Sequence, residues 1–229
     1  MPKKPTKLTQ QRRDRLAVIV PILRAQYPNA KCSLDFRSPL ELIVATILSA
    51  QCTDVRVNIV TKSLFTKYRS AADYAKATPE DLEKDIQSTG FYRNKTKSIQ
   101  SMARSLIEHH GGNVPSVMSQ LTELAGVGRK TANVVLGNAF GLNEGIAVDT
   151  HVTRVANRLG LTKHPSDAVK IELDLMPLIS PENWTELSHL LIFHGRNICD
   201  ARRPKCEECP LLPHCLAGPK ILKERVKAK

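Results

Sequence analysis

Four cysteines near the end of the sequence are the residues most clearly arranged for chemistry. They have the spacing C-x6-C-x2-C-x5-C and are Cys199, Cys206, Cys209 and Cys215. Four thiolates in so short a segment suit either zinc or an iron–sulfur cluster, and the residue types alone do not choose between the two. The spacing does differ from the paired C-x2-C units of most four-cysteine zinc sites. This segment is therefore expected to bind metal.

A second chemical motif is the string Leu-Ala-Gly-Val-Gly-Arg-Lys at 124–130. Glycine tolerates a positive φ and lets another backbone approach closely, so Gly126 and Gly128 favour a tight turn between two helices. Backbone N–H groups at such a turn and at the start of the second helix can bind a phosphate, helped by the helix dipole. The string predicts a helix–hairpin–helix that grips a nucleic-acid backbone without reading bases. An ordinary glycine turn in the core is the competing interpretation.

Lys130 follows this turn directly, and Asp149 stands nineteen positions later, in Val-Asp-Thr-His. The positive end of the helix dipole and Arg129 both disfavour a second positive charge at Lys130, which favours the neutral, nucleophilic amine. A phosphate-binding lysine is an equally good interpretation of the residue alone. Asp149 is placed to cap a helix, and its carboxylate could also stabilise developing positive charge or accept a proton. His151 is expected to pack or hydrogen-bond.

Composition agrees with an anionic partner. The 229 residues carry a net charge of +12 and a pI near 9.6, and an excess of this kind favours nucleic acid. No apolar run is long enough for a membrane span, and no secretory signal is apparent, so a disulfide framework is not favoured. Cys32 and Cys52 stand apart from the cluster and are expected to be small buried hydrophobic side chains.

The elements that must position these residues are predicted to be helices throughout. Ser38-Pro39 and Thr78-Pro79 combine a capping residue with proline in the first helical position, and glycines stop helices at Gly90, Gly111 and Gly160. Pro21 is expected to kink or break the first helix. Residues 1–7 are expected to be disordered and 218–229 to form a frayed basic tail. Helices are expected at 8–26, 39–50, 54–67, 71–77, 79–88, 94–110, 116–124, 129–140, 149–159, 165–176 and 181–198.

Residues 121–159 resemble the helix–hairpin–helix–Gly/Pro–Asp signature of base-excision DNA glycosylases. Within them, Gly-Arg-Lys-Thr-Ala at 128–132 and Val-Asp-Thr-His at 148–151 are similar to endonuclease III, and the cysteine spacing is that family's [4Fe–4S] loop in every interval. The resemblance covers about residues 31–217. It implies that Lys130 forms a Schiff base and that Asp149 is the catalytic aspartate. Adenine-specific mismatch glycosylases lack this lysine, so Lys130 indicates lyase activity as well as base removal.

The resemblance also implies DNA contacts. Gln51 would fill the gap left by a flipped base, and Phe91, where the family more often has an aliphatic side chain, would wedge into the opposite strand. The alternative for Gln51 is an exposed loop residue, and Phe91 could equally be a core residue. Arg93 and Lys95, after Phe91, suit phosphates as well as they suit water. The other expected contacts are Gly126, Gly128 and Arg129 in the hairpin and Arg202 and Lys205 in the cysteine loop, whose charges could instead keep that loop solvated.

The resulting expectation is an all-α, two-lobed helix–hairpin–helix DNA glycosylase fold. A six-helix barrel would span 31–143, a cluster domain 1–30 with 144–218, and a basic tail 219–229. The chain is expected to be a cytoplasmic monomer (nucleoid-associated if bacterial) with a [4Fe–4S] cluster. Its substrate would be duplex DNA with an oxidised pyrimidine or abasic site, cleaved by β-elimination. The alternative, from another class, is a non-catalytic iron–sulfur module that binds DNA and senses redox state.

Overall fold

Several helix starts are set by short polar side chains, as the sequence predicts. The structure is a computed structural model, and it describes residues 6–227. Ser38 caps α2 (Pro39–Leu48) by accepting a hydrogen bond from the Glu41 N–H, and Thr78 caps α5 (Pro79–Ile86) in the same way. Ser70 and Asp73 form a full capping box on α4 (Ala71–Lys76). These caps fix where each helix begins, and therefore where the connecting loops lie.

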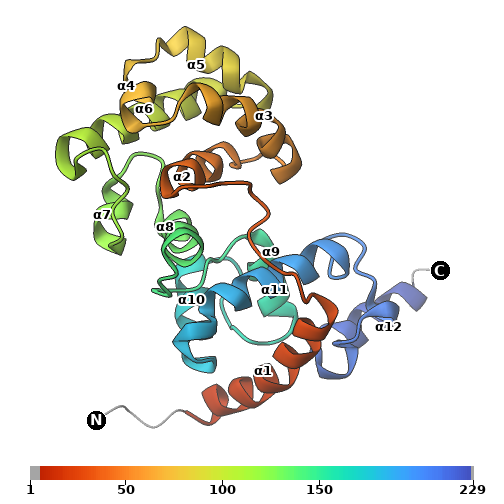
Figure 1. Ribbon diagram of the computed structural model, residues 1–229. Helices are drawn as coiled ribbons and strands as arrows, with labels where there is room; N and C mark the ends of the chain where they lie inside the picture. The colour runs from red at the N-terminus through yellow and green to blue at the C-terminus, as the bar shows by residue number, and fades with distance from the viewer. Residues whose placement is uncertain (1–5, 228–229) are drawn as a thin grey trace. The chain divides into compact units, whose positions relative to one another are not determined.

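The chain divides into two compact units (Figure 1), and each has its own hydrophobic core. One unit runs from Cys32 to Leu142. The other is built from the residues up to Lys31 together with those from Asn143 onward. The prediction from sequence placed these boundaries at 31–143 and at 1–30 with 144–218. We describe the first as the hairpin unit and the second as the cysteine unit, each by itself.

The hairpin unit contains α2 to α8 and a single-turn π-helix. Its core is lined by buried side chains such as Leu42, Val57, Leu82 and Leu106. The helices α4 and α5 both pack against the long helix α6 at this core. The elements after α2 are α3 (Asp54–Lys67), α4, α5, η1 (Gln87–Thr89), α6 (Tyr92–His110), α7 (Met118–Glu123), α8 (Arg129–Val135) and η2 (Leu136–Phe140).

The cysteine unit joins the N-terminal helix to the last third of the chain. Leu16, Ile19 and Leu23 of α1 (Lys7–Gln26) are buried in its core, and α9 and α11 pack against each other there. The remaining elements are α9 (Thr150–Arg158), α10 (Ala168–Leu175), η3 (Met176–Leu178), η4 (Pro181–Asn183), α11 (Trp184–Asn197), η5 (Cys206–Glu208), η6 (Leu212–His214) and α12 (Gly218–Lys227).

Three expectations about helices are corrected. α1 continues through Pro21, because burial of the residues around it outweighs the one backbone hydrogen bond that proline cannot make. α6 begins at Tyr92 rather than Asn94. Residues Gly218–Lys227 form α12 instead of a frayed tail, and Arg225 ties that helix to the Pro204 carbonyl and to Glu207. The expected disorder of 1–7 falls mostly outside the described residues, although Lys7 already begins α1.

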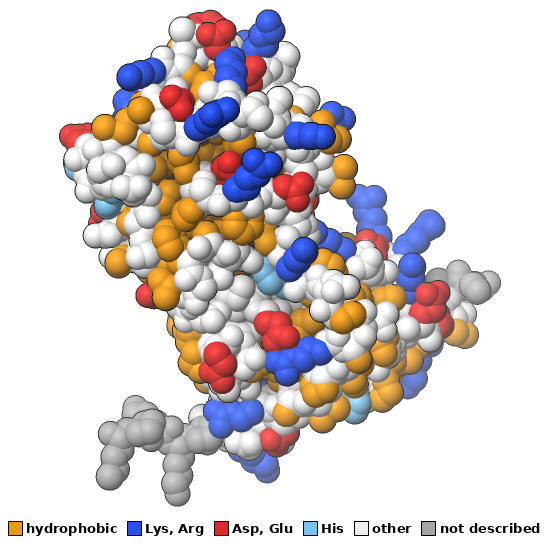
Figure 2. All heavy atoms as spheres, viewed as in Figure 1, with side chains coloured by type: hydrophobic (Ala, Val, Ile, Leu, Met, Phe, Trp, Pro, Cys, Tyr) orange, Lys and Arg blue, Asp and Glu red, His pale blue; other side chains and the backbone are white. Residues whose placement is uncertain are grey.

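All regular elements of residues 6–227 are helices, which confirms the all-α prediction. None of these helices is long and apolar enough to cross a membrane. On the face shown in Figure 2, Lys and Arg side chains are spread over both units, with Asp and Glu side chains among them. The positive excess is therefore not gathered into one patch on that face.

Candidate nucleic-acid interface and cluster site

The glycine string forms the turn between α7 and α8. Gly126 has φ +78°, a conformation that suits glycine, while Leu124 and Val127 on either side are buried. A Cβ at Gly126 would lie 3.0 Å from the Ser98 Cβ of α6, so the turn is seated directly on that helix. The turn is therefore fixed by packing.

The start of α8 is left open toward solvent. Gly128 occupies the N-cap position with extended backbone, and within the described chain no side chain caps this helix, in contrast to α2, α3, α4, α5 and α9. Nothing lies within 4 Å of where a Cβ at Gly128 would be. The first N–H groups of α8 are thus available to an outside acceptor. Lys130 is exposed in this first turn, beside the half-buried Arg129.

Two further loops of the hairpin unit have unusual backbone conformations. Gln51, between α2 and α3, has φ +52°, and Phe91, just before α6, has φ +48°. They are the two non-glycine residues of the described chain with positive φ, and each such conformation costs about 1–3 kcal/mol. Both side chains are exposed, Phe91 to 61%. The core interpretation of Phe91 is therefore wrong, because an apolar side chain here is held out on a strained backbone.

Asp149 caps α9, as predicted. Its Oδ1 accepts a 2.8 Å hydrogen bond from the Val152 N–H, and the carboxylate is half-buried. His151, one position into the helix, hydrogen-bonds through Nδ1 with the Arg154 guanidinium at 3.1 Å, so the expectation that it serves packing and hydrogen bonding is met. Burial lowers the pKa of His151, against the opposing effect of the Asp149 charge. The capping bond holds the Asp149 carboxylate in a fixed direction.

The four cysteines of the C-terminal loop line one cavity in the cysteine unit. Cys206 is buried and the other three are half-buried, and the remaining lining is mainly apolar. Among the described residues, no group of three or more His, Cys, Asp or Glu side chains is arranged to hold a single metal ion. Thiolates arranged around an apolar cavity fit an iron–sulfur cluster, in which each cysteine binds a separate iron.

Hydrogen-bond donors also point at the sulfur atoms, as around iron–sulfur clusters. The Gly218 N–H lies 3.2 Å from Cys215 Sγ, and Arg158 Nη1 lies 3.3 Å from Cys199 Sγ. His194 Nε2 lies 3.6 Å from Cys209 Sγ, while its Nδ1 is 3.3 Å from the Tyr27 hydroxyl. Burial lowers the pKa of His194 to about 4, which keeps the ring neutral at pH 7. The donor set thus fits the group that the spacing predicts.

Arg202 and Lys205, between the first two cysteines, are both exposed. Asp200 organises the backbone beneath them, because its Oδ1 accepts the N–H groups of Arg202 and Arg203 at 2.9 and 2.8 Å. These backbone hydrogen bonds lower the pKa of Asp200. The two cationic side chains are therefore carried on a defined loop and face water.

Lys95 corrects the interpretation made from the sequence. It was expected in a polar turn, facing phosphate or water, but its side chain is 4% exposed and its Nζ donates to two backbone carbonyls. Sequence analysis also missed Arg158, which holds the cysteine loop through the carbonyls of Asp200 and Ala201 at 2.6 and 2.9 Å. In each case, a basic residue on an otherwise apolar helix face is the feature of the sequence that could have indicated a buried hydrogen-bond donor. Cys32 and Cys52 are half-buried, less enclosed than expected.

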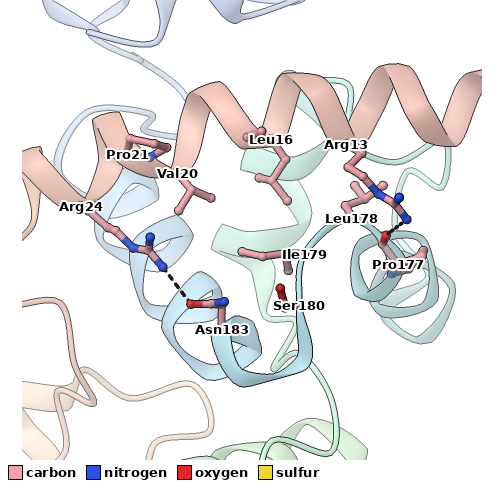
Figure 3. A pocket seen from close by; sticks show the side chains of 11 residues that line it. Arg13, Leu16, Val20, Pro21, Arg24, Pro177, Leu178, Ile179, Ser180 and Asn183 are labelled. Carbon is pink, nitrogen blue, oxygen red and sulfur yellow. Dashed lines mark hydrogen bonds between the residues drawn. The ribbon is translucent and has the colours of Figure 1, made fainter.

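A separate groove in the cysteine unit contains none of the candidate residues. This groove of about 540 Å³ runs between α1 and the η3–η4 segment, and Figure 3 shows its two ends bridged by arginines. Arg24 Nη2 donates to Asn183 Oδ1 at 2.8 Å, and Arg13 Nη2 donates to the Pro177 carbonyl at 2.8 Å. The groove is bridged by internal contacts of the unit and holds none of the groups expected to do chemistry.

Comparisons with known proteins agree with this geometry. Residues 44–181 match the family described as HhH-GPD superfamily base excision DNA repair protein, and residues 199–215 match the iron–sulfur binding domain of endonuclease III. The chain is 50% identical over 204 residues to endonuclease III of Synechocystis sp., covering 89% of this chain and 93% of that protein.

Solved structures show the same similarity in three dimensions. A non-covalent endonuclease III–DNA complex superposes with a TM-score of 0.89 at 45% identity, covering 92% of this chain and 98% of the other. A trapped covalent endonuclease III–DNA intermediate gives a TM-score of 0.88 at the same identity and coverage. The second of these proteins was captured while bonded to its DNA.

Proposed function

This chain belongs to the endonuclease III family of base-excision repair enzymes, DNA glycosylases with AP lyase activity, and from that premise we propose that Lys130 is its nucleophile and Asp149 its catalytic carboxylate. The observation that carries the proposal is the position of Lys130, exposed in the first turn of α8 directly after the fixed hairpin. Its amine reaches solvent where the adjoining N–H groups can hold a phosphate. The covalent intermediate of a 45% identical relative supports an attacking side chain of this kind.

The reaction proceeds in two stages. A flipped base gives access to C1′ of its sugar, because that carbon is shielded inside the stacked duplex. The Lys130 amine attacks C1′ as the bond to the base breaks, and the base leaves with the bonding electrons and takes up a proton. Asp149 stabilises the positive charge on the sugar. The bound nitrogen loses a proton, the C1′–O4′ bond of the sugar ring then breaks as O4′ takes up a proton, and a Schiff base forms between C1′ and Lys130. Removal of a C2′ proton expels the 3′ phosphate, and water hydrolyses the Schiff base to release the lysine.

The remaining residues hold the DNA. Gly126 sets the turn that presents the N–H group of Gly128 and the first N–H groups of α8, and these groups, with the Arg129 side chain, bind the phosphate backbone near the damaged nucleotide. Gln51 fills the space that the flipped base leaves, and Phe91 wedges into the opposite strand. Exposure of both side chains on strained loops supports these roles. Arg202 and Lys205 bind phosphate at a second place along the duplex. In a bacterial cell the enzyme would work on the nucleoid.

The substrate we propose is an oxidised pyrimidine or an abasic site in duplex DNA. The enzyme carries a [4Fe–4S] cluster, held by Cys199, Cys206, Cys209 and Cys215. Bound there, the cluster supplies cross-links between four points of the loop and a redox-active group. The chain's own residues then present the loop and its cations to DNA, while base removal uses Lys130 and Asp149.

Borohydride trapping tests the assignment of the nucleophile. Wild type, Lys130→Ala and Lys97→Ala are incubated with a duplex that contains one oxidised pyrimidine, and the covalent adduct is measured. Lys97 is the matched control, because it is an exposed lysine of the same unit. We expect the adduct from wild type and Lys97→Ala and none from Lys130→Ala. Absence of any adduct from folded, cluster-loaded wild type, on this duplex and on an abasic one, would favour the non-catalytic binding module.

A second variant separates catalysis from helix capping at Asp149. Asparagine can still accept the Val152 N–H as an N-cap but has no charge, so Asp149→Asn should keep its melting temperature while base excision falls by a factor of about 100 or more. Excision at the wild-type rate would remove Asp149 from the mechanism and leave it as a cap only.

A further inference from the structure

The Gln51 loop and the Phe91 loop share one feature that their sequences do not show. Gln51 follows the C-terminal end of α2, and Phe91 follows the C-terminal end of η1, so each loop begins where a helix leaves carbonyls without partners inside the helix. Both loops then adopt a backbone that side-chain-bearing residues avoid. Such a conformation persists only where the surroundings enforce it.

Lys95 is the residue that reaches both of these helix ends. Its Nζ donates to the Leu48 carbonyl, the last of α2, at 2.8 Å, and to the Thr89 carbonyl, the last of η1, also at 2.8 Å. Its own backbone N–H donates to the Phe91 carbonyl at 3.1 Å. The Lys95 side chain therefore hydrogen-bonds the segments that precede both loops, whereas its backbone bond to Phe91 is the ordinary helical bond at the start of α6.

The position is a costly one for a lysine. The side chain is buried, no described carboxylate pairs with it, and it stands in the first turn of α6, where the helix dipole disfavours a cation. Burial lowers the pKa of its amine, opposed only by the half-buried thiol of Cys52. The compensation comes from the two carbonyls, which lie at the negative ends of their own helices. The two hydrogen bonds of the Lys95 amine do not stabilise α6 itself. They fix the starts of the two neighbouring loops.

The hairpin rests on the same short stretch of α6. Ser98, one turn beyond Lys95, lies against Gly126, and a Cβ at Gly126 would also lie 3.6 Å from Cδ1 of Ile47, the neighbour of Leu48. The first two turns of α6 therefore act as a common base for the Gln51 loop, the Phe91 loop and the phosphate-binding turn. Loops that share one rigid base keep a constant spacing from one another.

We infer that Lys95 is a positioning residue for duplex opening, which holds the Gln51 and Phe91 loops at a fixed separation so that both side chains enter the DNA together when a base flips. The inference rests on the proposed roles of those two side chains. Because preformed loops lose little conformational entropy when DNA binds, more of the binding free energy is available to unstack the base. Lys95 contacts no reacting atom in this account.

The test compares two substrates under single-turnover conditions. One duplex carries the oxidised pyrimidine opposite a normal base, and the other carries it opposite an abasic residue, where the lesion is unpaired and opening is easier. Lys95→Met keeps the apolar stem and removes the charge and both hydrogen bonds. We expect excision from the paired duplex to fall by about 100-fold, as for a small misplacement of positioning groups, and excision from the unpaired duplex to fall much less.

A matched control shows whether the effect is merely loss of stability. Gln100 is also a buried polar residue of α6, and its Nε2 donates to the Ala77 carbonyl at 2.8 Å, away from both loops. Gln100→Met should lower the melting temperature but change excision from the two substrates by the same factor. If Lys95→Met folds poorly, Lys95→Gln, which keeps a shorter neutral donor, should show an intermediate difference between the substrates.

A double-mutant comparison separates this inference from the function on which it rests. In a Gln51→Ala/Phe91→Ala background, the further change Lys95→Met should have little effect on the paired duplex, because the side chains it positions are gone. If Gln51→Ala/Phe91→Ala leaves excision from the paired duplex unchanged, the proposed role of the loops is wrong. Two results would overturn only the role of Lys95 while Gln51→Ala/Phe91→Ala is impaired. One is that Lys95→Met lowers excision from both substrates by the same factor. The other is that the losses from Lys95→Met and from Gln51→Ala/Phe91→Ala multiply in the combined variant.

Discussion

In both units a cationic side chain fixes an irregular loop by donating to backbone carbonyls. The two units differ in how buried that side chain is and in how many groups it contacts. In the hairpin unit the buried Lys95 binds two carbonyls through one nitrogen. In the cysteine unit the partly buried Arg158 spreads its two terminal nitrogens over Asp200, Ala201 and the Cys199 sulfur. An ammonium is a point charge, whereas a guanidinium is a planar fork with several donors.

The difference follows from what each loop must do. The Gln51 and Phe91 loops carry single side chains whose positions matter, and a buried donor with two short hydrogen bonds leaves little freedom. The cysteine loop must surround a cluster, which itself cross-links the loop once bound. Arg158 therefore needs only to bring the first cysteine near its place, and a distributed, partly hydrated set of contacts is sufficient.

Loss of a cluster ligand should have the largest effect, and it should be confined to one unit. Cys206→Ser replaces the buried ligand, so we expect no visible charge-transfer absorption and loss of amide hydrogen-exchange protection in the cysteine unit, because metal binding and folding are coupled. Protection in 32–142 should persist, since that unit has its own core. Cys32→Ser is the control and should keep the absorption. Loss of protection in both units would mean that they do not fold separately.

Arg158→Met should have an intermediate effect and sharpens the contrast with Lys95. Removing several charge-assisted hydrogen bonds should cost about 2 kcal/mol in the stability of the cysteine unit. The cluster should bleach faster under oxidant, as followed by visible absorption. The ratio of excision rates on the paired and unpaired duplexes should stay at the wild-type value. A changed ratio with an intact cluster would show that the two cations do not act on separate loops.

The smallest effect concerns acid. Burial lowers the pKa of His189, on α11, below its ordinary value of 6.5. Above 6.5 the ring is neutral in the folded and unfolded states, and it contributes no pH dependence. Below 6.5 the unfolded chain takes up a proton that the folded chain refuses, so stability falls until the lowered folded pKa is reached. His189→Gln should make the stability profile between pH 7 and pH 5 shallower, by at most about 1.4 kcal/mol per pH unit, in chemical denaturation. Equal slopes would contradict it.

Features written in local sequence were predictable. Ser38-Pro39 and Thr78-Pro79 start helices as expected because a capping side chain acts within three residues, and the Gly126 turn follows from a backbone need that few residues meet. The spacing of the four cysteines predicts a common site for the same reason. In each case the cause and its effect lie close together in the chain.

Features that depend on distant residues were not predictable. Pro21 stays within α1 because that helix is held by a core from the far end of the sequence. In the sequence, Lys95 looks like a surface lysine, because its partner Leu48 is 47 positions away and only the fold brings the two together. The residues that position a loop therefore escaped sequence analysis more often than the residues that the loop presents.

The order of the two units along the chain sets the order in which they can be completed during synthesis. Arg12 and Arg24 of α1 find their partners Asp174 and Glu186 only 162 positions later. The whole of 32–142 leaves the ribosome in the meantime, and domains generally fold as units in the order in which they emerge. A nascent chain therefore has its hairpin and loops finished while α1 still exposes its apolar face. Cluster binding needs all four cysteines of the C-terminal loop, so we expect that a chain made without iron has a completed hairpin unit and an unfinished cysteine unit.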